Sequence, residues 1–466
     1  WWVDCAIDGV LIVCFFLSSP FSQGGGGGPM YVGELSKPGK SASGNNVKTL
    51  KGHKERVNAL AFNPHDDNIL ASGSDDADIR LWRLESGGVG GECVNTLGGH
   101  IRSIRALLWN PNCNNVLASS SSDNTVRLWD ASSSGDAKVT IDVGEAPLSM
   151  CYNYKGDGLA VAGRKHVVFV DPRTGGDPHT TIKDTHQGSK GQRIVWLRDQ
   201  NYLFTVGSTK AAAREFKIWD VRNPGGKALS AITIDRGAGM LNPFYDEDTN
   251  LIYLASKGES SIHVYDMDGV SSTVKPRECS KASVPGAIMC GMCVLPKNTC
   301  QVQDTQVLRG LHASSTSVQT ITFKVPRAAK LAQYFHDDLY PATRDLNNVT
   351  MDASAYFDAL DVAVPEVNTV SLRPKDMPLL SEKPKDVVKS SRPKASTYLA
   401  AQRKEEERLR AKDEQFQRLE ALAHQHARYN ANNSMGSRKI KGERDRVAAR
   451  DDDNDDSSDS GWSDDD

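Results

Sequence analysis

A recurring aromatic residue organises the middle of the chain. It closes a short apolar segment every 40 to 50 residues, at Trp82, Trp129, Phe169, Trp219 and Tyr265. Asp directly follows three of these aromatics, and two repeats open with Gly-His dipeptides that are 47 residues apart. A period of about 45 residues restricts the chain to folds that repeat one supersecondary unit, because a single unit cannot bury its own apolar face.

Each repeat has the pattern of antiparallel strands joined by tight turns. In one repeat a strand ends at Ala118, residues 122–124 favour a turn, and apolar residues alternate up to Trp129. With their Gly-His and Trp-Asp ends, the repeats are similar to WD repeats, each of which forms one four-stranded blade of a β-propeller. Residues 52–323 correspond to about six blades at this period, and the preceding residues must supply the rest of a seventh.

We therefore expect an all-β fold, a seven-bladed WD-repeat β-propeller that is complete or lacks part of its first blade. A C-terminal extension, a helix and a disordered acidic tail should follow it. The predicted domains are an anomalous N-terminal segment (1–23), the propeller (24–345), an extension and linker (346–396), a helix (397–430), a basic segment (431–450) and an acidic tail with a Trp (451–466).

The polar residues of two repeats predict a structural network. In WD repeats a His, a turn Asp, a Ser and a Trp are joined by hydrogen bonds, and the similarity assigns these roles to two sets: His53, Ser72, Asp76 and Trp82, then His100, Ser119, Asp123 and Trp129. A His-Asp-Ser set also suits a nucleophilic triad, but a catalytic nucleophile is unique whereas this set recurs with the fold period. The repeats ending in Phe169 and Tyr265 have lost the Gly-His, so we expect a buried aromatic there without the network.

Five segments in and after the fourth and fifth repeats resemble the coronins. They are residues 216–220, 241–250, 252–258, 295–297 and 334–344. The last of these is the aromatic-acidic-Tyr-Pro element that coronins carry just past the propeller, where it packs back underneath. The resemblance extends from about Gly24 to about Arg373. It implies a seven-bladed propeller with a C-terminal extension, binding to actin filaments and a role in actin organisation.

The two ends of the chain differ from those of short coronins. Those proteins end in a regular coiled coil, whereas this chain has a Pro/Lys/Ser linker, a charged helix and an acidic end. That arrangement resembles the C-terminal half of the tandem-propeller coronins (the coronin-7 and POD subfamily), so an upstream propeller is missing or the lineage has one propeller. The basic opening segment of coronins, on which filament binding and ring closure depend, has no counterpart before Gly24.

The first residues and the cysteines bear on the compartment. Residues 9–17 are apolar like a signal-peptide core, but Asp4 and Asp8 precede them in place of basic residues, and the run is too short to span a bilayer. We interpret this run as a strand or as mistranslated sequence. No later segment is apolar enough for a membrane helix.

The nine cysteines show no disulfide pattern, and Cys290 and Cys293 lie in an apolar run without a second ligand pair, which favours burial over metal binding.

Charge is strongly partitioned in the last hundred residues. Residues 371–450 hold 20 basic and 11 acidic residues, and residues 451–466 hold nine Asp and no Lys or Arg. Residues 400–429 lack Pro and Gly and carry a weak apolar stripe, so they predict a helix that is solvated, coiled with a second helix or docked in a partner groove. The acidic run predicts a disordered tail.

Trp462 is out of place in a merely solvated acidic tail, because an exposed indole serves better as a binding anchor. A helix, a basic patch and an acidic run around a Trp resemble the connector-acidic region of actin-nucleation promoters, which bind the Arp2/3 complex. The resemblance assigns this binding to Trp462 with Asp451, Asp452, Asp453, Asp455, Asp456, Asp459, Asp464, Asp465 and Asp466. Because no actin-monomer-binding motif precedes the helix, we expect the tail to occupy Arp2/3 without delivering actin, as an inhibitor or localiser.

The chain contains none of the common catalytic motifs that we sought. A Walker loop, a His-Glu-x-x-His motif and a Gly-x-Ser-x-Gly motif are missing, so we expect a non-enzymatic protein with no cofactor or metal. The predicted function is a cytoplasmic regulator of the actin cytoskeleton that binds filaments and Arp2/3. The alternatives are a propeller adaptor in Golgi or vesicle traffic, or a basic-linker binder of microtubules or RNA. A specific nucleic-acid partner is not expected, and the oligomeric state stays open.

Overall fold

The computed structural model describes residues 2–5, 10–14, 30–34, 48–85, 90–176, 180–198, 201–270, 275–284, 288–314, 317–360 and 362–382. Contacts divide the chain into two units, Trp1–Glu382 and Lys383–Asp466. The second unit lies outside the described residues. The predicted helix (397–430), basic segment (431–450) and acidic tail (451–466) therefore lie there too.

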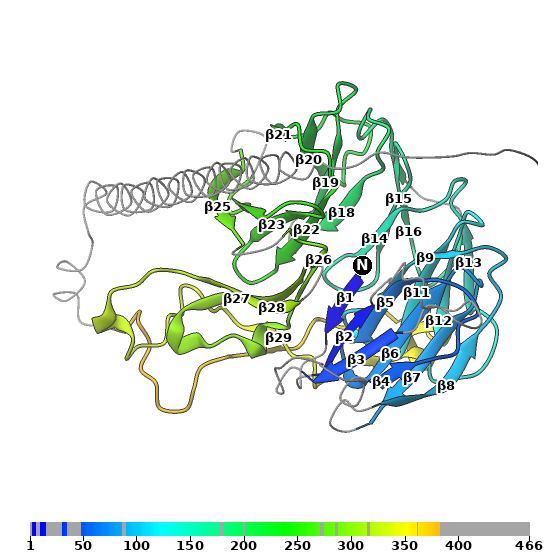
Figure 1. Cartoon of the computed structure of the whole chain (residues 1–466), viewed down its shortest axis with the longest axis horizontal. Helices are drawn as coiled ribbons and strands as arrows, with labels where there is room; N and C mark the ends of the chain where they lie inside the picture. The colour runs from blue at the N-terminus through cyan, green and yellow to red at the C-terminus, as the bar shows by residue number, and fades with distance from the viewer. Residues whose placement is uncertain are drawn as a thin grey trace, which may run out of the picture. The chain divides into compact units, whose positions relative to one another are not determined.

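Six four-stranded sheets follow one another in the described part of the chain (Figure 1). The first holds β1 (Trp2–Cys5), β2 (Val10–Cys14), β3 (Met30–Glu34) and β4 (Lys48–Leu50); the second, β5 (Val57–Asn63), β6 (Asp66–Ser74), β7 (Ile79–Leu84) and β8 (Gly91–Leu97); the third, β9 (Ile104–Trp109), β11 (Val116–Ser121), β12 (Thr125–Asp130) and β13 (Val139–Asp142). The fourth holds β14 (Ser149–Tyr152), β15 (Leu159–Ala162), β16 (Val167–Val170) and β17 (Thr180–Ile182); the fifth, β18 (Arg193–Trp196), β19 (Tyr202–Ser208), β20 (Arg214–Asp220) and β21 (Ser230–Asp235); the sixth, β22 (Leu241–Asp246), β23 (Leu251–Ser256), β24 (Ser261–Asp266) and β25 (Arg277–Ser283).

A further sheet of β26 (Gly291–Val294), β27 (Gln306–Ala313) and β28 (Val318–Lys324) has three strands among the described residues. Figure 1 shows the sheets following one another in chain order around a common centre, which is the arrangement of a β-propeller. The prediction of an all-β propeller is confirmed to the level of six four-stranded blades. A closed ring of seven blades stays a prediction.

The first sheet begins in the segment that the sequence marks as anomalous. β1 and β2 come from residues 1–23, and β2 pairs antiparallel with both β1 and β3. The apolar run is thus a strand over Val10–Cys14. No helix in the part of the chain that the structure describes is both long and apolar enough to cross a membrane.

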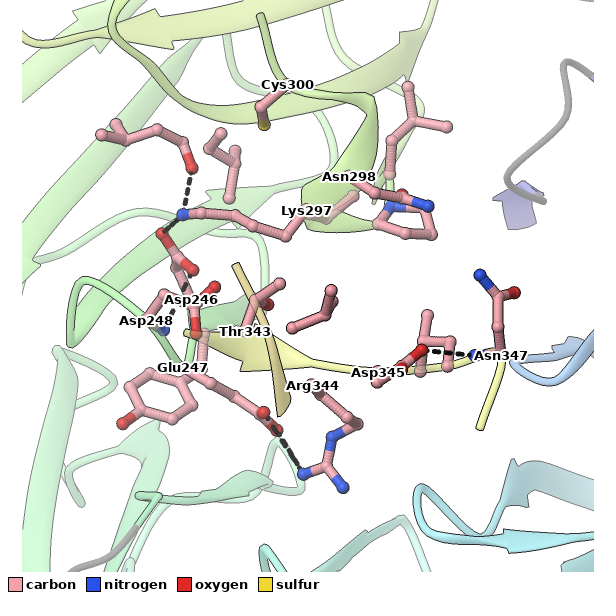
Figure 2. Close-up of a pocket in the computed structure, with 18 residues that line it drawn as sticks. Asp246, Glu247, Asp248, Lys297, Asn298, Cys300, Thr343, Arg344, Asp345 and Asn347 are labelled. Carbon is pink, nitrogen blue, oxygen red and sulfur yellow. Dashed lines mark hydrogen bonds and ion pairs between the residues drawn. The ribbon is translucent and has the colours of Figure 1, made fainter. Parts of the chain in front are cut away.

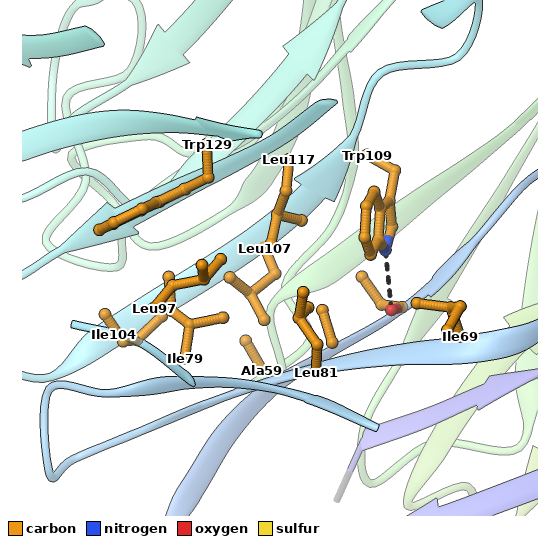
Figure 3. Close-up of a cluster of buried hydrophobic side chains, with 12 residues drawn as sticks. Ala59, Ile69, Ile79, Leu81, Leu97, Ile104, Leu107, Trp109, Leu117 and Trp129 are labelled. Carbon is orange, nitrogen blue, oxygen red and sulfur yellow. Dashed lines mark hydrogen bonds between the residues drawn. The ribbon is translucent and has the colours of Figure 1, made fainter. Parts of the chain in front are cut away.

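The core lies between neighbouring sheets, because each sheet has two apolar faces and must bury both. All five repeating aromatics occupy the third strand of their sheets, in β7, β12, β16, β20 and β24. Figure 3 shows the layer between the second and third sheets, where Leu81 and Ile79 of β7 pack with Leu107 of β9 and Trp129 of β12. The indole Nε1 of Trp109 donates to the carbonyl oxygen of Ala61 across this layer at 2.9 Å.

From here on, extension means residues 325–382, which begin before the predicted boundary at residue 346 and contain short elements only. They are η3 (Ala329–Leu331), β29 (Thr343–Arg344), β30 (Met351–Asp352), α1 (Ala353–Asp358) and β31 (Thr369–Val370); η1 (Lys297–Thr299) and η2 (Val302–Asp304) precede β27. β30 pairs in parallel with β10 (Cys113–Asn114) of the third sheet's loop, and β29 pairs with β31. The extension thereby contacts the loops that leave the first strands of the sheets. We call this end of the propeller the extension end.

Tyr356 anchors the extension to the fourth sheet. Its side chain is fully buried, and its hydroxyl donates to the carbonyl oxygen of Gly156 at 2.9 Å. Gly156 has a φ of 81°, and a Cβ at this position would collide with the side chain of Asn110, so the turn requires glycine. Arg173 lies over the Tyr356 ring and donates to the Tyr356 carbonyl oxygen at 3.0 Å. The extension is therefore held by the contact of Arg173 with one aromatic ring and by the hydroxyl of that ring.

Candidate functional site

The first predicted network is assembled around the His53 ring. Its Nδ1 lies 3.0 Å from Asp76 Oδ2, and its Nε2 lies 2.7 Å from Ser72 Oγ. The indole Nε1 of Trp82 donates to Ser72 Oγ at 2.8 Å. Because a carboxylate only accepts, the imidazole donates from Nδ1, and the Ser72 hydroxyl donates to Nε2. These bonds fix the turn between β6 and β7. The Ser72 hydroxyl is buried among them, so it is not accessible to a substrate as a catalytic nucleophile must be.

The second network repeats this geometry one sheet later. His100 Nδ1 lies 2.8 Å from Asp123 Oδ2, its Nε2 lies 2.8 Å from Ser119 Oγ, and Trp129 Nε1 donates to Ser119 Oγ at 2.8 Å. Thr125 adds a hydroxyl bond to Asp123 at 2.7 Å. The structure thus brings together all four residues of each predicted set.

A third network, which the sequence analysis did not predict, lies in the repeat that ends in Trp219. In the fifth sheet, His186 Nδ1 lies 3.0 Å from Glu215 Oε1 and its Nε2 lies 2.9 Å from Thr205 Oγ1. Trp219 Nε1 donates to Thr205 Oγ1 at 3.0 Å. Thr replaces Ser, and the carboxylate comes from strand β20 in place of the turn. The usable signal was the spacing of 19 residues between the His and the hydroxyl residue, which is the same in all three networks.

Burial governs the titration of these networks. It lowers the pKa of His53, His100 and His186, and the nearby carboxylates oppose this effect without overcoming it. Burial by itself would raise the pKa of Glu215, but hydrogen bonds from His186 and Lys217 bring it below its usual value. The pKa of Asp123 is lowered in the same way by Thr125 and His100. The imidazoles are therefore neutral and the carboxylates ionised in the folded state at neutral pH.

We expect the protein to lose stability as the pH falls from 7.5 to 5.5. Each of the three histidines binds a proton near pH 6.5 in the unfolded chain and at lower pH in the folded one. The unfolded state therefore binds more protons below pH 6.5, and each histidine lowers the free energy of unfolding by up to about 1.4 kcal/mol per pH unit. Urea unfolding across this range measures the loss. His166→Gln, at a half-exposed position, is the control and should keep the pH dependence. A free energy of unfolding that stays constant from pH 7.5 to 5.5 in the wild type would contradict the prediction.

Three segments that resemble coronin sequences meet at the extension end (Figure 2). The end of β22 supplies Asp246 and the turn after it supplies Asp248, the segment after β26 supplies Lys297, and β29 supplies Arg344. They line a cavity of about 250 Å³. Residues that are far apart in the sequence thus form one site under the sixth sheet and the three-stranded sheet.

Charge pairs hold this junction together. Lys297 Nζ donates to Asp246 Oδ2 at 2.5 Å and to the carbonyl oxygen of Val307 at 2.6 Å. The Arg344 guanidinium donates to Tyr154 O at 3.0 Å, lies 3.3 Å from Glu247 and covers the Tyr154 ring at 4.4 Å. Burial raises the pKa of Asp248, which Arg198 binds at 3.1 Å. The cations of the cavity are all engaged, so the geometry suits the seating of the extension better than chemistry on a ligand.

A second cavity, of about 520 Å³, lies where the innermost strands converge. Residues of β5, β9, β14, β18, β22 and β26 line it, so it is the central channel of the propeller. Arg193 and Lys257 are the charged residues of its lining, and the rest is apolar or uncharged.

Comparison with known proteins identifies the family. A model described as "WD domain, G-beta repeat" matches residues 44–83 and 91–130, and one described as "Type of WD40 repeat" matches residues 318–363. Coronin-A of Dictyostelium discoideum is 38% identical over 322 residues, which are 68% of this chain and 69% of Coronin-A. The chain belongs to the coronin family. The prediction made from the five segments is confirmed.

Other coronins match a similar share of the chain. Coronin-7 of Rattus norvegicus is 31% identical over 68% of this chain and 34% of its own length, so the chain spans only about a third of that relative. The WD40 domain of Toxoplasma gondii coronin superimposes with a TM-score of 0.70 and 28% identity, over 79% of this chain and 91% of that domain. The charged helix and acidic end that favoured the tandem-propeller coronins lie outside the described residues.

The remaining predicted residues of this coronin can be placed as follows. Cys293 is buried on β26, and Cys290 lies half-buried just before that strand. The described residues contain no cluster of three His, Cys, Asp or Glu that could hold a metal ion. The predicted Arp2/3-binding residues, Trp462 and the nine Asp from Asp451 to Asp466, lie outside the described residues, and their role stays a prediction.

Proposed function

We propose that this coronin is a non-enzymatic regulator of the actin cytoskeleton. A seven-bladed propeller, with the three-stranded sheet as its seventh blade, is the scaffold that binds actin filaments. The acidic tail around Trp462 binds the Arp2/3 complex without delivering an actin monomer, as an inhibitor or localiser in the cytoplasm. Family membership together with the meeting of three coronin-like segments at the extension end carries this proposal.

The two ends of the propeller suggest where a filament would bind. The extension occupies the loops that leave the first strands, whereas the loops that lead into β5 and β9 lie at the opposite end of those strands. These loops present Lys54, Arg102 and Ile101, whose side chain is 80% exposed. A cationic surface with an exposed apolar anchor suits an acidic protein partner, because charge steers the encounter and burial of the anchor holds it. We assign filament contact to this end.

The Trp462→Ala variant of the full chain separates the two binding functions. We expect its affinity for purified Arp2/3 complex to fall on the order of 30-fold, the effect of losing an aromatic hot spot. Its co-sedimentation with actin filaments should match that of the wild type, because the propeller is untouched. Pull-down and co-sedimentation at one salt concentration measure both.

Ser463→Ala is the matched control, since it changes the tail without removing the indole. Equal Arp2/3 binding by all three proteins would reject the tail assignment. Failure of the wild type to co-sediment with filaments would reject the propeller assignment. Strong activation of actin polymerisation by the full chain through Arp2/3, in a pyrene-actin assay, would contradict the inhibitory role.

A further inference from the structure

The central channel contains a cation without an anionic partner. Arg193, at the start of β18, donates from Nη1 to the carbonyl oxygens of Leu148 at 2.8 Å and Gln192 at 3.3 Å. No carboxylate pairs with it among the described residues, and burial lowers its pKa without an opposing charge. Arg214, the next buried arginine along the chain, instead binds Asp235 and Glu259. The Arg193 guanidinium is half-buried and keeps donors that main-chain oxygens do not fill.

Lys257 adds a second positive charge to the same cavity. It follows β23, is exposed, and has no carboxylate partner in the described ranges. Among the described residues that line this cavity, none is Asp or Glu. Two cations with no counter-charge among the described lining residues give the wall of this concave site a positive potential, which low-dielectric walls strengthen. The positive charge of the channel therefore favours the binding of an anion.

The rest of the lining is uncharged, mostly apolar and rich in sulfur. Met150 on β14, Met289, and Met292 on β26 line the cavity together with Cys290 and Cys293. Methionine side chains adapt to irregular shapes and pack well against aromatic rings. A volume of about 520 Å³ falls in the range of small-molecule sites, which are mostly apolar with a few polar groups that fix orientation. The channel thus offers two cations and an adaptable wall rich in sulfur.

We propose that the central channel binds a small molecule that carries an anionic head on a compact apolar body. The head, a carboxylate or a similar oxyanion, pairs with Arg193 and Lys257. The body packs on Met150, Met289 and Met292. Arg is well suited to this role because its planar guanidinium binds a carboxylate through two hydrogen bonds. This site is independent of the proposed filament and Arp2/3 binding.

Calorimetry with 2-naphthoate and its neutral amide, 2-naphthamide, tests the proposal on the full chain. The two probes share the apolar body and differ in the charge of the head. We expect 2-naphthoate to bind at least about tenfold more tightly, since charge-assisted hydrogen bonds are roughly twice as strong as neutral ones. Arg193→Gln should remove this preference, and Lys257→Gln should reduce it. Arg236→Gln, an exposed cation outside the cavity lining, is the control and should leave binding unchanged.

Alkylation of cysteines provides a second readout that locates the probe. Bound 2-naphthoate should slow the reaction of Cys290, which lines the channel, and leave that of the exposed Cys93 on β8 unchanged. Equal affinity for 2-naphthoate and 2-naphthamide would overturn the proposal. Unchanged binding of 2-naphthoate by both single variants, Lys257→Gln and Arg193→Gln, would overturn it as well. Lys257 is exposed, so its variant folds even if Arg193→Gln does not. Binding of an Asp-rich peptide but not of 2-naphthoate would assign the channel to a protein partner and overturn the small-molecule site.

Discussion

Replacing Tyr356 by alanine is expected to lower the free energy of unfolding by about 3–5 kcal/mol, the usual cost of deleting a buried aromatic side chain. The ring is fully buried between the extension and the third and fourth sheets, where it packs with Cys113, Val116 and Val364. Urea unfolding of the full chain measures the loss. Hydrogen exchange of the amides in α1 should rise in the same variant, because the helix loses its anchor.

Tyr356→Phe is the matched control for this experiment. It keeps the ring and removes the hydroxyl bond to Gly156, whose carbonyl oxygen still accepts a bond from Asn110 at 2.8 Å. The acceptor is therefore not orphaned, and the loss should be about 1 kcal/mol. Similar losses in the alanine and phenylalanine variants would show that the ring does not anchor the extension.

Replacing Trp129 by alanine is expected to cost a similar 3–5 kcal/mol. The indole is 1% exposed, fills the layer between the second and third sheets and donates to Ser119. Its loss opens a cavity and leaves the Ser119 hydroxyl without this donor. Trp129→Phe fills most of the space but cannot donate, so we expect a loss of about 1–2 kcal/mol. Urea unfolding monitored by circular dichroism measures both.

Trp82→Ala in the preceding sheet tests whether the effect belongs to the repeated network. Trp82 is 2% exposed and makes the same bond to Ser72, so its loss should match that of Trp129. A small effect at both positions would mean that the networks do not stabilise the propeller.

The blade period was predictable because five of the sheets each bury one large aromatic on the third strand. This burial fixes the position of Trp82 or Tyr265 in the strand, whatever the length of the loops. The polar networks were predictable only where the turn Asp keeps its spacing. The His186 network was missed because its carboxylate, Glu215, lies on a strand and bonds to Lys217 as well. The network requires only that the imidazole, hydroxyl and carboxylate atoms lie within hydrogen-bond distance. More than one spacing of these residues in the sequence achieves this.

The two cavities could not be predicted from the sequence for a different reason. The channel takes one or a few residues from each of seven strands, so Arg193 and Lys257 carry no local pattern that sets them apart from other surface cations. At the extension end, Lys297 and Arg344 were part of the family resemblance, but their partners depend on how the extension crosses the sheets. Only three-dimensional packing brings such residues together.

The layered attachment of the extension determines how the molecule responds to tension. A pull on the chain beyond Glu382 first meets the bond from Ser381 N to Asp337 Oδ1 at 3.2 Å and then the Phe335 backbone, which bonds to Pro378 and Leu380 at 2.7 and 2.8 Å. It next meets the pairing of β29 with β31, and only then the Tyr356 anchor. A mechanical load would therefore break these contacts one after another and extend the chain in steps before it reached the blades.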